Sequence, residues 1–197
     1  MNSYLSREEL DAMGFKSLGQ NVCLSRKASV YAPERIQIGA NVRIDDFVFL
    51  SGDIALGSHV HIAPFCSLVG GSAGAGIVME DFSGLSGNVM IYAVSDDYSG
   101  DFMTNPTVHD CFTNVKTGEV ALRRYVIVGA GSVILPGVEI GEGAAVAAMS
   151  LVTRQLPPWK ICAGIPARPL KDRSRNLLEL EKQYRMDTLP SERGCAV

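Results

Sequence analysis

The sequence lacks the features that mark membrane proteins, secreted proteins and nucleic-acid binders. It has no run of about 18 apolar residues, which a membrane-spanning helix requires. The N-terminus, MNSYLSREEL, has no charged-then-apolar signal-peptide pattern. Basic residues are not in excess, with 18 Lys and Arg against 21 Asp and Glu, so the usual charge of a nucleic-acid binder is missing. We therefore expect a cytoplasmic protein with no membrane span and no nucleic-acid partner.

Metal-ligating side chains are also scarce. The five cysteines form no CxxC pair and have no histidine at zinc-site spacing, so we expect no metal site. We expect reduced, mostly buried thiols, as in a cytosolic protein. The chain has only three histidines, His59, His61 and His109, which limits the choice of a histidine base.

Aliphatic residues recur at every sixth position in three phased blocks. The positions are Ile38, Ile44, Leu50, Leu56, Ile62 and Leu68, then Met79, Leu85 and Ile91, then Leu122, Val128, Ile134, Ile140, Val146 and Val152. A period of six fits neither the 3.6-residue α-helix nor the two-residue alternation of a strand. It predicts short strands joined by tight corners, with three hexads in each coil and parallel pairing between coils. We expect an all-β solenoid of four to six coils; the alternative, a β-sandwich, would not hold a strict six-residue phase.

Two interruptions of the repeat predict segments outside the coils. About five extra residues at 70–74 predict a bulge, and the 31-residue step from Ile91 to Leu122 predicts an inserted loop over 92–121. Insertions in solenoids gather on one face, which is often the binding face. The loop contains a dense polar set, so we expect it to contribute to the functional site.

The two ends of the chain predict short helices. Ser6 and Glu9 form a capping-box pattern, which predicts a helical cap within residues 1–19. Residues 20–170 form the predicted solenoid domain. Residues 171–197 predict a C-terminal helix, through Met186, followed by a mobile tail.

The hexads resemble those of the hexapeptide-repeat acyltransferases. The resemblance is carried by 38–43 (IGANVR) and 128–133 (VGAGSV), and it is most specific over 126–170, with GVEIG at 137–141 and AGIPA at 163–167. This last segment is similar to the C-terminal coils of galactoside and maltose O-acetyltransferases. The resemblance implies a left-handed parallel β-helix, a homotrimer, and acetyl-CoA as co-substrate with no metal.

The resemblance also implies a line of acetyl-CoA contacts along the stacked corners. Gly129 and Ala147 lie 18 residues apart, one coil above the other, and small residues let a ligand approach the backbone. If these small residues do not contact acetyl-CoA, their role is tight packing at the corners. If the Arg and Lys residues of the last coils do not contact it, they form an ordinary solvated surface. By similarity, the expected cofactor contacts are Ala130 and Ala148 on pantetheine, Thr153, Arg154, Arg168 and Lys171 at the phosphates, Ile165 and Pro166 on adenine, and Ser86 near the thioester.

The chain departs from the galactoside and maltose enzymes at the catalytic histidine. Asp96 occupies the place at which those enzymes have this residue, with Asp97 next to it. A hydroxyl must lose its proton as it attacks, whereas a neutral amine already has a lone pair and needs mainly orientation. The missing histidine therefore favours N-acetylation, with Asp96 or Asp97 orienting the amine or relaying its proton. Asn88, Tyr98 and His109 are the expected substrate-binding residues.

Other segments resemble the acetyltransferases of bacterial O-antigen and capsule clusters. They include SDDYSG at 95–100 and FMTNPT at 102–107. Within that group the similarity points to the N-acetyltransferases of dTDP-4-amino-4,6-dideoxyglucose.

Two other functions remain open from the sequence. The first is a sugar O-acetyltransferase in which His61 or His109 is the base; His61 and His59 flank Val60 and should both point outward. The second is a non-catalytic β-helix, either a scaffold or a metal-binding trimer of the carbonic-anhydrase type, for which the histidines lack the required spacing.

Overall fold

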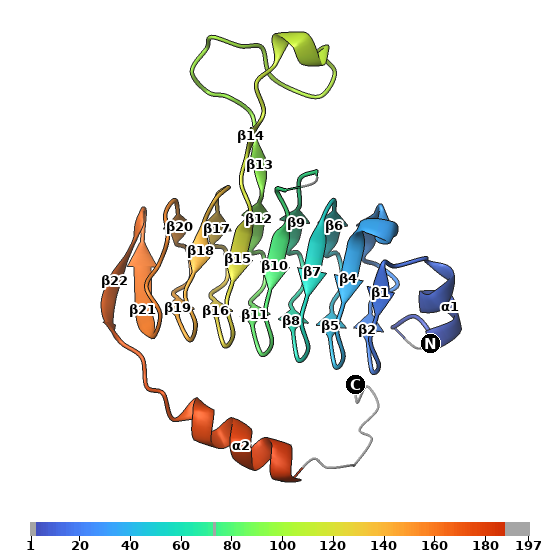
Figure 1. Cartoon of the computed structure of the whole chain (residues 1–197), viewed down its shortest axis with the longest axis vertical. Helices are drawn as coiled ribbons and strands as arrows, with labels where there is room; N and C mark the ends of the chain where they lie inside the picture. Colours follow the sequence, from blue (N-terminus) through green and yellow to red (C-terminus); the bar gives the residue numbers. More distant parts are fainter. Residues whose placement is uncertain (1–2, 73, 188–197) are drawn as a thin grey trace.

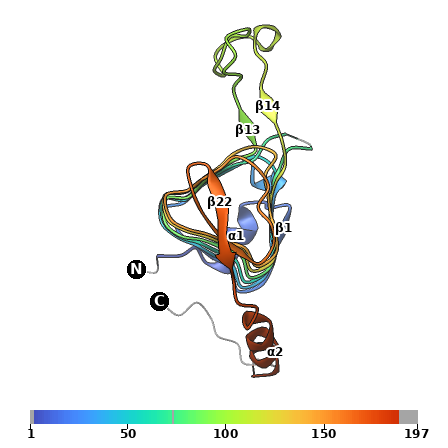
Figure 2. The same cartoon turned by 90° about the vertical axis from the view of Figure 1, so that its left-hand side faces the viewer.

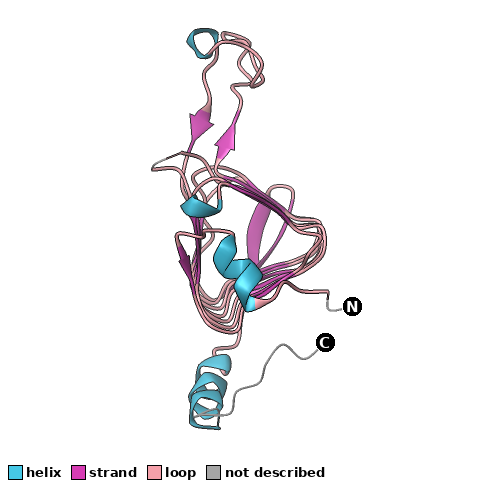
Figure 3. Cartoon of the chain, turned by 90° about the vertical axis from the view of Figure 1, so that its right-hand side faces the viewer, coloured by secondary structure: helices cyan, strands magenta, loops and turns pink. Residues whose placement is uncertain are grey.

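The chain folds into a parallel β-solenoid with a triangular cross-section, seen from the side in Figure 1 and along its axis in Figure 2. The computed structural model describes residues 3–72 and 74–187. Helix α1 (Arg7–Ala12) lies across the N-terminal end of the coils (Figure 3), and its residue Leu10 is buried in the core. Ser6 caps this helix, and both hydrogen bonds of the predicted capping box with Glu9 are present, which confirms that prediction.

Each side of the triangle is one sheet. The first face consists of β1 (Ser17–Leu18), β4 (Ile36–Ile38), β7 (Ile54–Leu56), β10 (Ile77–Met79), β15 (Val120–Leu122) and β18 (Glu139–Ile140). The second face consists of β2 (Cys23–Leu24), β5 (Arg43–Ile44), β8 (His61–Ile62), β11 (Gly84–Leu85), β16 (Ile127–Val128), β19 (Ala145–Val146), β21 (Lys160–Gly164) and β22 (Ala167–Asp172). The third face consists of β3 (Ser29–Tyr31), β6 (Phe49–Ser51), β9 (Ser67–Val69), β12 (Met90–Tyr92), β17 (Val133–Ile134) and β20 (Leu151–Val152).

The six-residue repeat forms the core of the solenoid. All the aliphatic positions of the three phased blocks are at most 4% exposed. They stack in register between coils, as Ile44 does on Ile62 and Ile62 on Leu85. The fold predicted from the period is therefore confirmed, because each coil buries its apolar side chains against the next one.

The predicted number of coils was too low. The second face has eight strands, of which only β22 is antiparallel, and the seven parallel strands mark about seven turns. The first coil was missed because a 3-10 turn, η1 (Pro33–Arg35), adds two residues between Val30 and Ile38. This insertion shifts the six-residue phase, so that Leu18, Leu24 and Val30 fall outside the series that begins at Ile38.

The long insertion leaves the solenoid at one corner. The chain departs after β12 and returns at β15, so Tyr92, Val120 and Ala121, which were assigned to the loop, belong to strands. The stem of the loop is an antiparallel pair, β13 (Val94–Ser95) with β14 (Lys116–Thr117), and a 3-10 turn, η2 (Asp110–Phe112), lies beyond it. Figure 1 shows the loop projecting from the solenoid on the side opposite to the C-terminal helix.

The C-terminal helix begins later than predicted. Residues from 171 were expected to be helical, but Lys171 and Asp172 belong to β22, which pairs antiparallel with β21, and α2 spans Leu177–Asp187. Strand β22 covers the edge of β21, which would otherwise end the sheet with unpaired backbone groups. The predicted tail lies outside the described residues.

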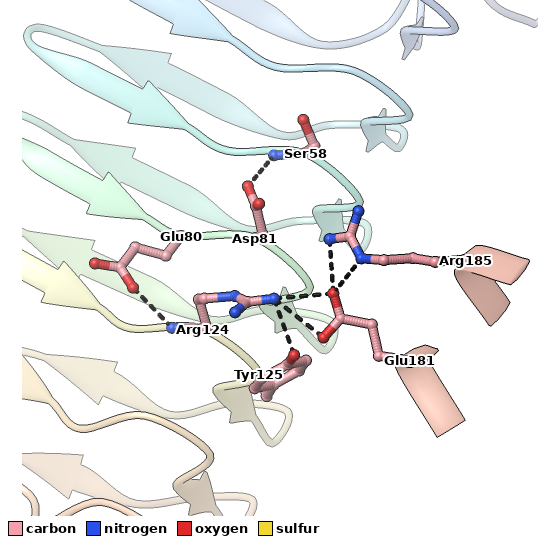
Figure 4. Close-up of polar contacts among 7 residues, drawn as sticks. All are labelled: Ser58, Glu80, Asp81, Arg124, Tyr125, Glu181 and Arg185. Carbon is pink, nitrogen blue, oxygen red and sulfur yellow. Dashed lines mark hydrogen bonds and ion pairs between the residues drawn. The ribbon is translucent and has the colours of Figure 1, made fainter. Parts of the chain in front are cut away.

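A cluster of ion pairs connects α2 to the coils (Figure 4). The carboxylate of Glu181 accepts hydrogen bonds from Arg124 at 2.9 and 3.0 Å and from Arg185 at 2.7 Å. The backbone N–H of Arg124 in turn donates to Glu80 at 3.0 Å. The side chain of Glu181 is 12% exposed, so these contacts fix α2 beside the corner between the first and second faces.

One cysteine departs from expectation. Cys23 is disulfide-bonded, so the prediction that all five cysteines are reduced is wrong for this residue. Cys66, Cys111 and Cys162 are free, and Cys66 and Cys162 are buried. Cys195 lies outside the described residues.

The corner at Gly129 sets a limit on side-chain size. A Cβ atom at this position would lie 2.4 Å from the backbone nitrogen of Ala148 in the next coil, closer than a real contact allows. We expect Gly129→Ala to lower the free energy of unfolding by about 2 kcal/mol, because the two coils would have to separate. Gly84→Ala is the matched control, since its Cβ would meet no atom nearer than 3.6 Å. Thermal unfolding of both variants checks this; an equal melting temperature for the two would contradict it.

Candidate active site

A cavity of about 740 Å³ lies between the third face and the inserted loop. Its solenoid wall includes Tyr92, Val133 and Leu135, and the loop supplies most of the polar groups. The polar residues that line it from the loop are Ser95, Asp96, Tyr98, Asn105, Asp110 and Thr113. The loop is therefore one wall of a cavity that could hold a ligand.

The two adjacent aspartates of the loop have different surroundings. Asp96 lines the cavity, and its carboxylate accepts no hydrogen bond from the residues that the structure describes. Asp97 is only 8% exposed, and its carboxylate accepts from the Ser99 N–H at 2.8 Å and the Asn114 amide at 2.7 Å and lies 2.9 Å from the Lys116 ammonium. These contacts, with Ser99 the largest, hold the pKa of Asp97 far below its usual value. Asp96 is thus the carboxylate that is free to meet a ligand.

The other predicted substrate-binding residues are spread over the loop and one corner. Tyr98 lines the cavity and is 90% exposed. His109 is exposed and caps η2, its Nδ1 accepting from the Cys111 N–H at 3.3 Å. Asn88 is exposed at the corner between the second and third faces, with a positive φ of 60°. Within one chain, only Tyr98 of these three shares the cavity with Asp96.

His61 lies in another part of the molecule. It lines a separate, largely apolar cavity of about 600 Å³ between the second face and α2. Its Nε2 is 2.8 Å from Oδ2 of Asp45, which is buried. Burial alone would raise the pKa of Asp45, but hydrogen bonds from His61, Arg43 and Tyr4 lower it below the usual value. His61 is held by a buried carboxylate and is not brought together with Asp96 within one chain.

Ser86 lies at the start of the line of small corner residues. The pairing of β11, β16 and β19 stacks Gly84–Leu85 under Ile127–Val128 and Ala145–Val146, so the corners that follow these strands also stack. The backbone N–H of Ser86 donates to the Val128 carbonyl at 2.9 Å, whereas its hydroxyl has no partner among the described residues. Ser86 can therefore offer its hydroxyl to a ligand, but its N–H is already used by the sheet.

The remaining predicted cofactor contacts continue this line toward the C-terminal end. Ala130 and Ala148 are exposed on successive coils, and the N–H of Met149 donates to the Ala130 carbonyl at 2.9 Å. The rest are all exposed in the last coils: Thr153, Arg154, Ile165, Pro166, Arg168 and Lys171. Arg154 and Lys171 make no ion pair with any described residue, so both cations are free for an anionic ligand.

Sequence reasoning missed the partners of Asp97. Asn114 and Lys116 approach Asp97 because β13 and β14 pair across the loop. No periodicity joins residues on the two sides of this insertion, so no pattern in the sequence indicated the contact. The described residues also contain no group of three or more side chains able to hold a metal ion, and none of their helices is long and apolar enough to cross a bilayer.

Comparison with known proteins gives strong similarities over nearly the whole chain. A dTDP-4-amino-4,6-dideoxy-D-glucose acyltransferase from Escherichia coli is 41% identical over 186 residues, which are 93% of this chain and 95% of the relative. The crystal structure of AntD, an N-acyltransferase from Bacillus cereus, in complex with dTDP and 3-hydroxybutyryl-CoA has a TM-score of 0.91 at 49% identity, with 95% of this chain and 98% of that chain covered.

A more distant structure shares the fold alone. A maltose O-acetyltransferase from Clostridium difficile has a TM-score of 0.58 at 21% identity over 86% of this chain and 75% of that one. No protein-family model matches the chain. The left-handed β-helix and the resemblance to acyltransferases are confirmed by these structures. The chain belongs to the hexapeptide-repeat acyltransferases, in the family of the dTDP-4-amino-4,6-dideoxyglucose acyltransferases.

Proposed function

We propose that this enzyme transfers the acetyl group of acetyl-CoA to the amino group of dTDP-4-amino-4,6-dideoxyglucose. The observation that carries the proposal is the carboxylate of Asp96, which lines the cavity under the loop and has no partner among the described residues. A serine-to-cysteine variant of the similar Bacillus cereus protein has been solved with dTDP-4-amino-4,6-dideoxyglucose and coenzyme A. A carboxylate suits an amine nucleophile, which it can orient and then deprotonate.

The spacing of two residues supports the same assignment. Solved variants of the Bacillus cereus protein replace one serine and one aspartate that stand ten positions apart. Ser86 and Asp96 are the only serine and aspartate with that spacing and order in this sequence. We therefore assign Ser86 and Asp96 to the reacting end of the site.

In the proposed reaction the sugar amine attacks the thioester carbonyl carbon. The C–N bond forms, the C–S bond breaks, and the amine proton leaves through the Asp96 carboxylate as the sulfur of CoA departs and is protonated. The hydroxyl of Ser86 donates to the carbonyl oxygen as negative charge develops on it, a role that its N–H, bonded to Val128, cannot take. Asp97, His61 and His109 are not needed as bases in this scheme.

Acetyl-CoA would follow the corner from Ser86 over Ala130 and Ala148. From β11 to β21 is three strand spacings, or about 14 Å, which leads toward the exposed cations of the last coils. Arg154, Arg168 and Lys171 would pair with the phosphates, with Thr153 beside them. Ile165 and Pro166 would lie against the adenine. At the other end, Asn88 and Tyr98 would bind the nucleotide sugar, with His109 reaching in from the loop.

The site is incomplete within one chain, which favours a homotrimer. Ser86 lies at the corner before β12, whereas Asp96 lies in the loop that follows it, so the two flank the third face. A neighbouring copy packed beside this face would close the gap between them. Sedimentation equilibrium should then give a mass three times 21.1 kDa; a monomer that retains full activity would contradict this arrangement.

We place the enzyme in the cytoplasm, in the synthesis of O-antigen or other surface polysaccharide. The support for this placement is that both proposed co-substrates, a nucleotide sugar and acetyl-CoA, are metabolites of the cytoplasm.

Thiol release from acetyl-CoA tests the proposed reaction. We expect rapid release with dTDP-4-amino-4,6-dideoxyglucose and little with dTDP-6-deoxyglucose, which carries a hydroxyl in place of the amine. Because the Bacillus cereus structure contains 3-hydroxybutyryl-CoA, that thioester is compared in parallel. Equal turnover of the hydroxyl sugar, or turnover of galactose or maltose, would contradict N-acetylation and direct attention to His61 and its partner Asp45.

A further inference from the structure

One side chain, Asp97, contacts both sides of the inserted loop just beyond its paired stem. Asp97 lies two residues beyond the end of the short strand β13, and its Oδ1 accepts the N–H of Ser99 on the same side of the loop. Its Oδ2 receives the amide of Asn114 at 2.7 Å and the ammonium of Lys116 at 2.9 Å, both from the returning side. The backbone also joins the two sides, through the two-residue ladder of β13 and β14, the Gly118 N–H on the Ala93 carbonyl at 2.9 Å, and the Met103 N–H on the Phe112 carbonyl at 2.9 Å.

Such a short hairpin has little stability of its own. Isolated two-stranded ribbons are marginal in water, and this one stands away from the solenoid (Figure 2). The side chain of Asp97 is 8% exposed, so its hydrogen bonds are protected from water, and bonds to charged groups are the stronger ones. The contacts of Asp97 are therefore a major part of what joins the two sides of the loop.

The neighbouring residue depends on this arrangement. Asp96 lines the cavity whereas Asp97, the next residue, does not, so the contacts that fix Asp97 also fix the backbone that carries Asp96. A carboxylate that already accepts from an amide, an ammonium and a backbone N–H is a weak base, because all three donors favour its charged form. Asp97 is thus suited to holding the loop and poorly suited to accepting a proton from substrate.

We infer that Asp97 is a positioning residue that locks the stem of the loop and thereby aims Asp96 into the active-site cavity. This inference rests on the proposed function for the role of Asp96, but the lock itself is a property of the loop. The two adjacent aspartates thus have different roles: Asp96 acts on the substrate, and Asp97 stabilises the stem of the loop.

The test combines activity with a direct probe of the loop. Asp97→Asn removes the charge that pairs with Lys116, and Lys116→Met removes the partner while leaving Asp97 intact. We expect kcat/KM to fall about 10- to 100-fold in both, because a displacement of about 1 Å at the reacting group has that effect. We also expect chymotrypsin to cleave after Tyr98, Phe102 or Phe112 at least fivefold faster in both variants, and the double variant to show no further loss beyond Asp97→Asn.

Asp101→Asn is the matched control, because Asp101 is exposed on the same loop and makes no ion pair among the described residues. It should behave like the wild type in both assays. If Asp97→Asn abolishes activity while its cleavage rate is unchanged and Lys116→Met is fully active, Asp97 acts on the substrate and the inference is wrong. It is equally wrong if Asp97→Asn and Lys116→Met leave both activity and cleavage unchanged. Failure of the wild type to turn over any amino sugar would instead remove the proposed function, and the cleavage comparison would still test the lock.

Discussion

Replacing Asp96 by Asn is expected to reduce acetyl transfer about 1,000-fold while leaving the affinity for CoA unchanged. The carboxylate of Asp96 lines the cavity without a protein partner, so it is available to orient the amine and accept its proton. General-base catalysis by a positioned side chain contributes about 10²- to 10⁴-fold. The amide of Asn can still orient the amine but cannot take the proton. The measurement is kcat from thiol release at saturating acetyl-CoA, with CoA binding followed by calorimetry.

The control for Asp96→Asn is Asp101→Asn, which makes the same change of charge at an exposed position of the same loop. It should retain wild-type kcat. If Asp96→Asn keeps more than about a tenth of the activity, another group removes the proton. His61 would then be the next candidate, since its ring is already held by Asp45.

Replacing Ile134 by Ala is expected to give the largest loss of stability. Ile134 is fully buried in the third face and stacks between Ile91 and Val152 of the adjacent coils. Removing its side-chain atoms loses apolar burial and leaves a cavity, which together lower the free energy of unfolding by about 3 kcal/mol. For a chain of this length that corresponds to a decrease of roughly 10 °C in the melting temperature.

Ile127→Ala provides a matched control for Ile134→Ala. Ile127 is on the neighbouring strand β16 but is 46% exposed. The same change of atoms there should lower the melting temperature by only a few degrees in the isolated chain. Equal losses for the two variants would contradict the inside-outside assignment of the six-residue repeat.

The core of the fold could be predicted from the sequence because it obeys one rule. Each hexad places one aliphatic side chain in the interior, where it packs against the coils above and below. The six-residue period therefore identifies the interior residues even when the residues they contact are unknown. The rule failed at η1, where two extra residues shift the phase, and at β22, where Lys171 and Asp172 complete the edge of β21. Both places lie near an end of the solenoid, where a segment packs against residues that do not follow the six-residue repeat.

The candidate site could be predicted only in part. The sequence indicated the loop and its polar segment, but it did not separate Asp96 from Asp97. That distinction depends on Asn114 and Lys116, which approach across a hairpin that has no periodic signal. The position of Ser86 on the line of small corner residues follows from the repeat, whereas the placement of His61 beside α2 depends on tertiary packing.

The most direct test of the proposed function is to determine which atom of the product carries the acetyl group. The enzyme is incubated with acetyl-CoA and dTDP-4-amino-4,6-dideoxyglucose, and the purified product is analysed by NMR and by its stability to hydroxylamine. Transfer to the amine gives an amide at the sugar nitrogen that resists hydroxylamine, and this is the predicted result. A hydroxylamine-sensitive ester on a sugar hydroxyl, with the amine left free, would contradict it.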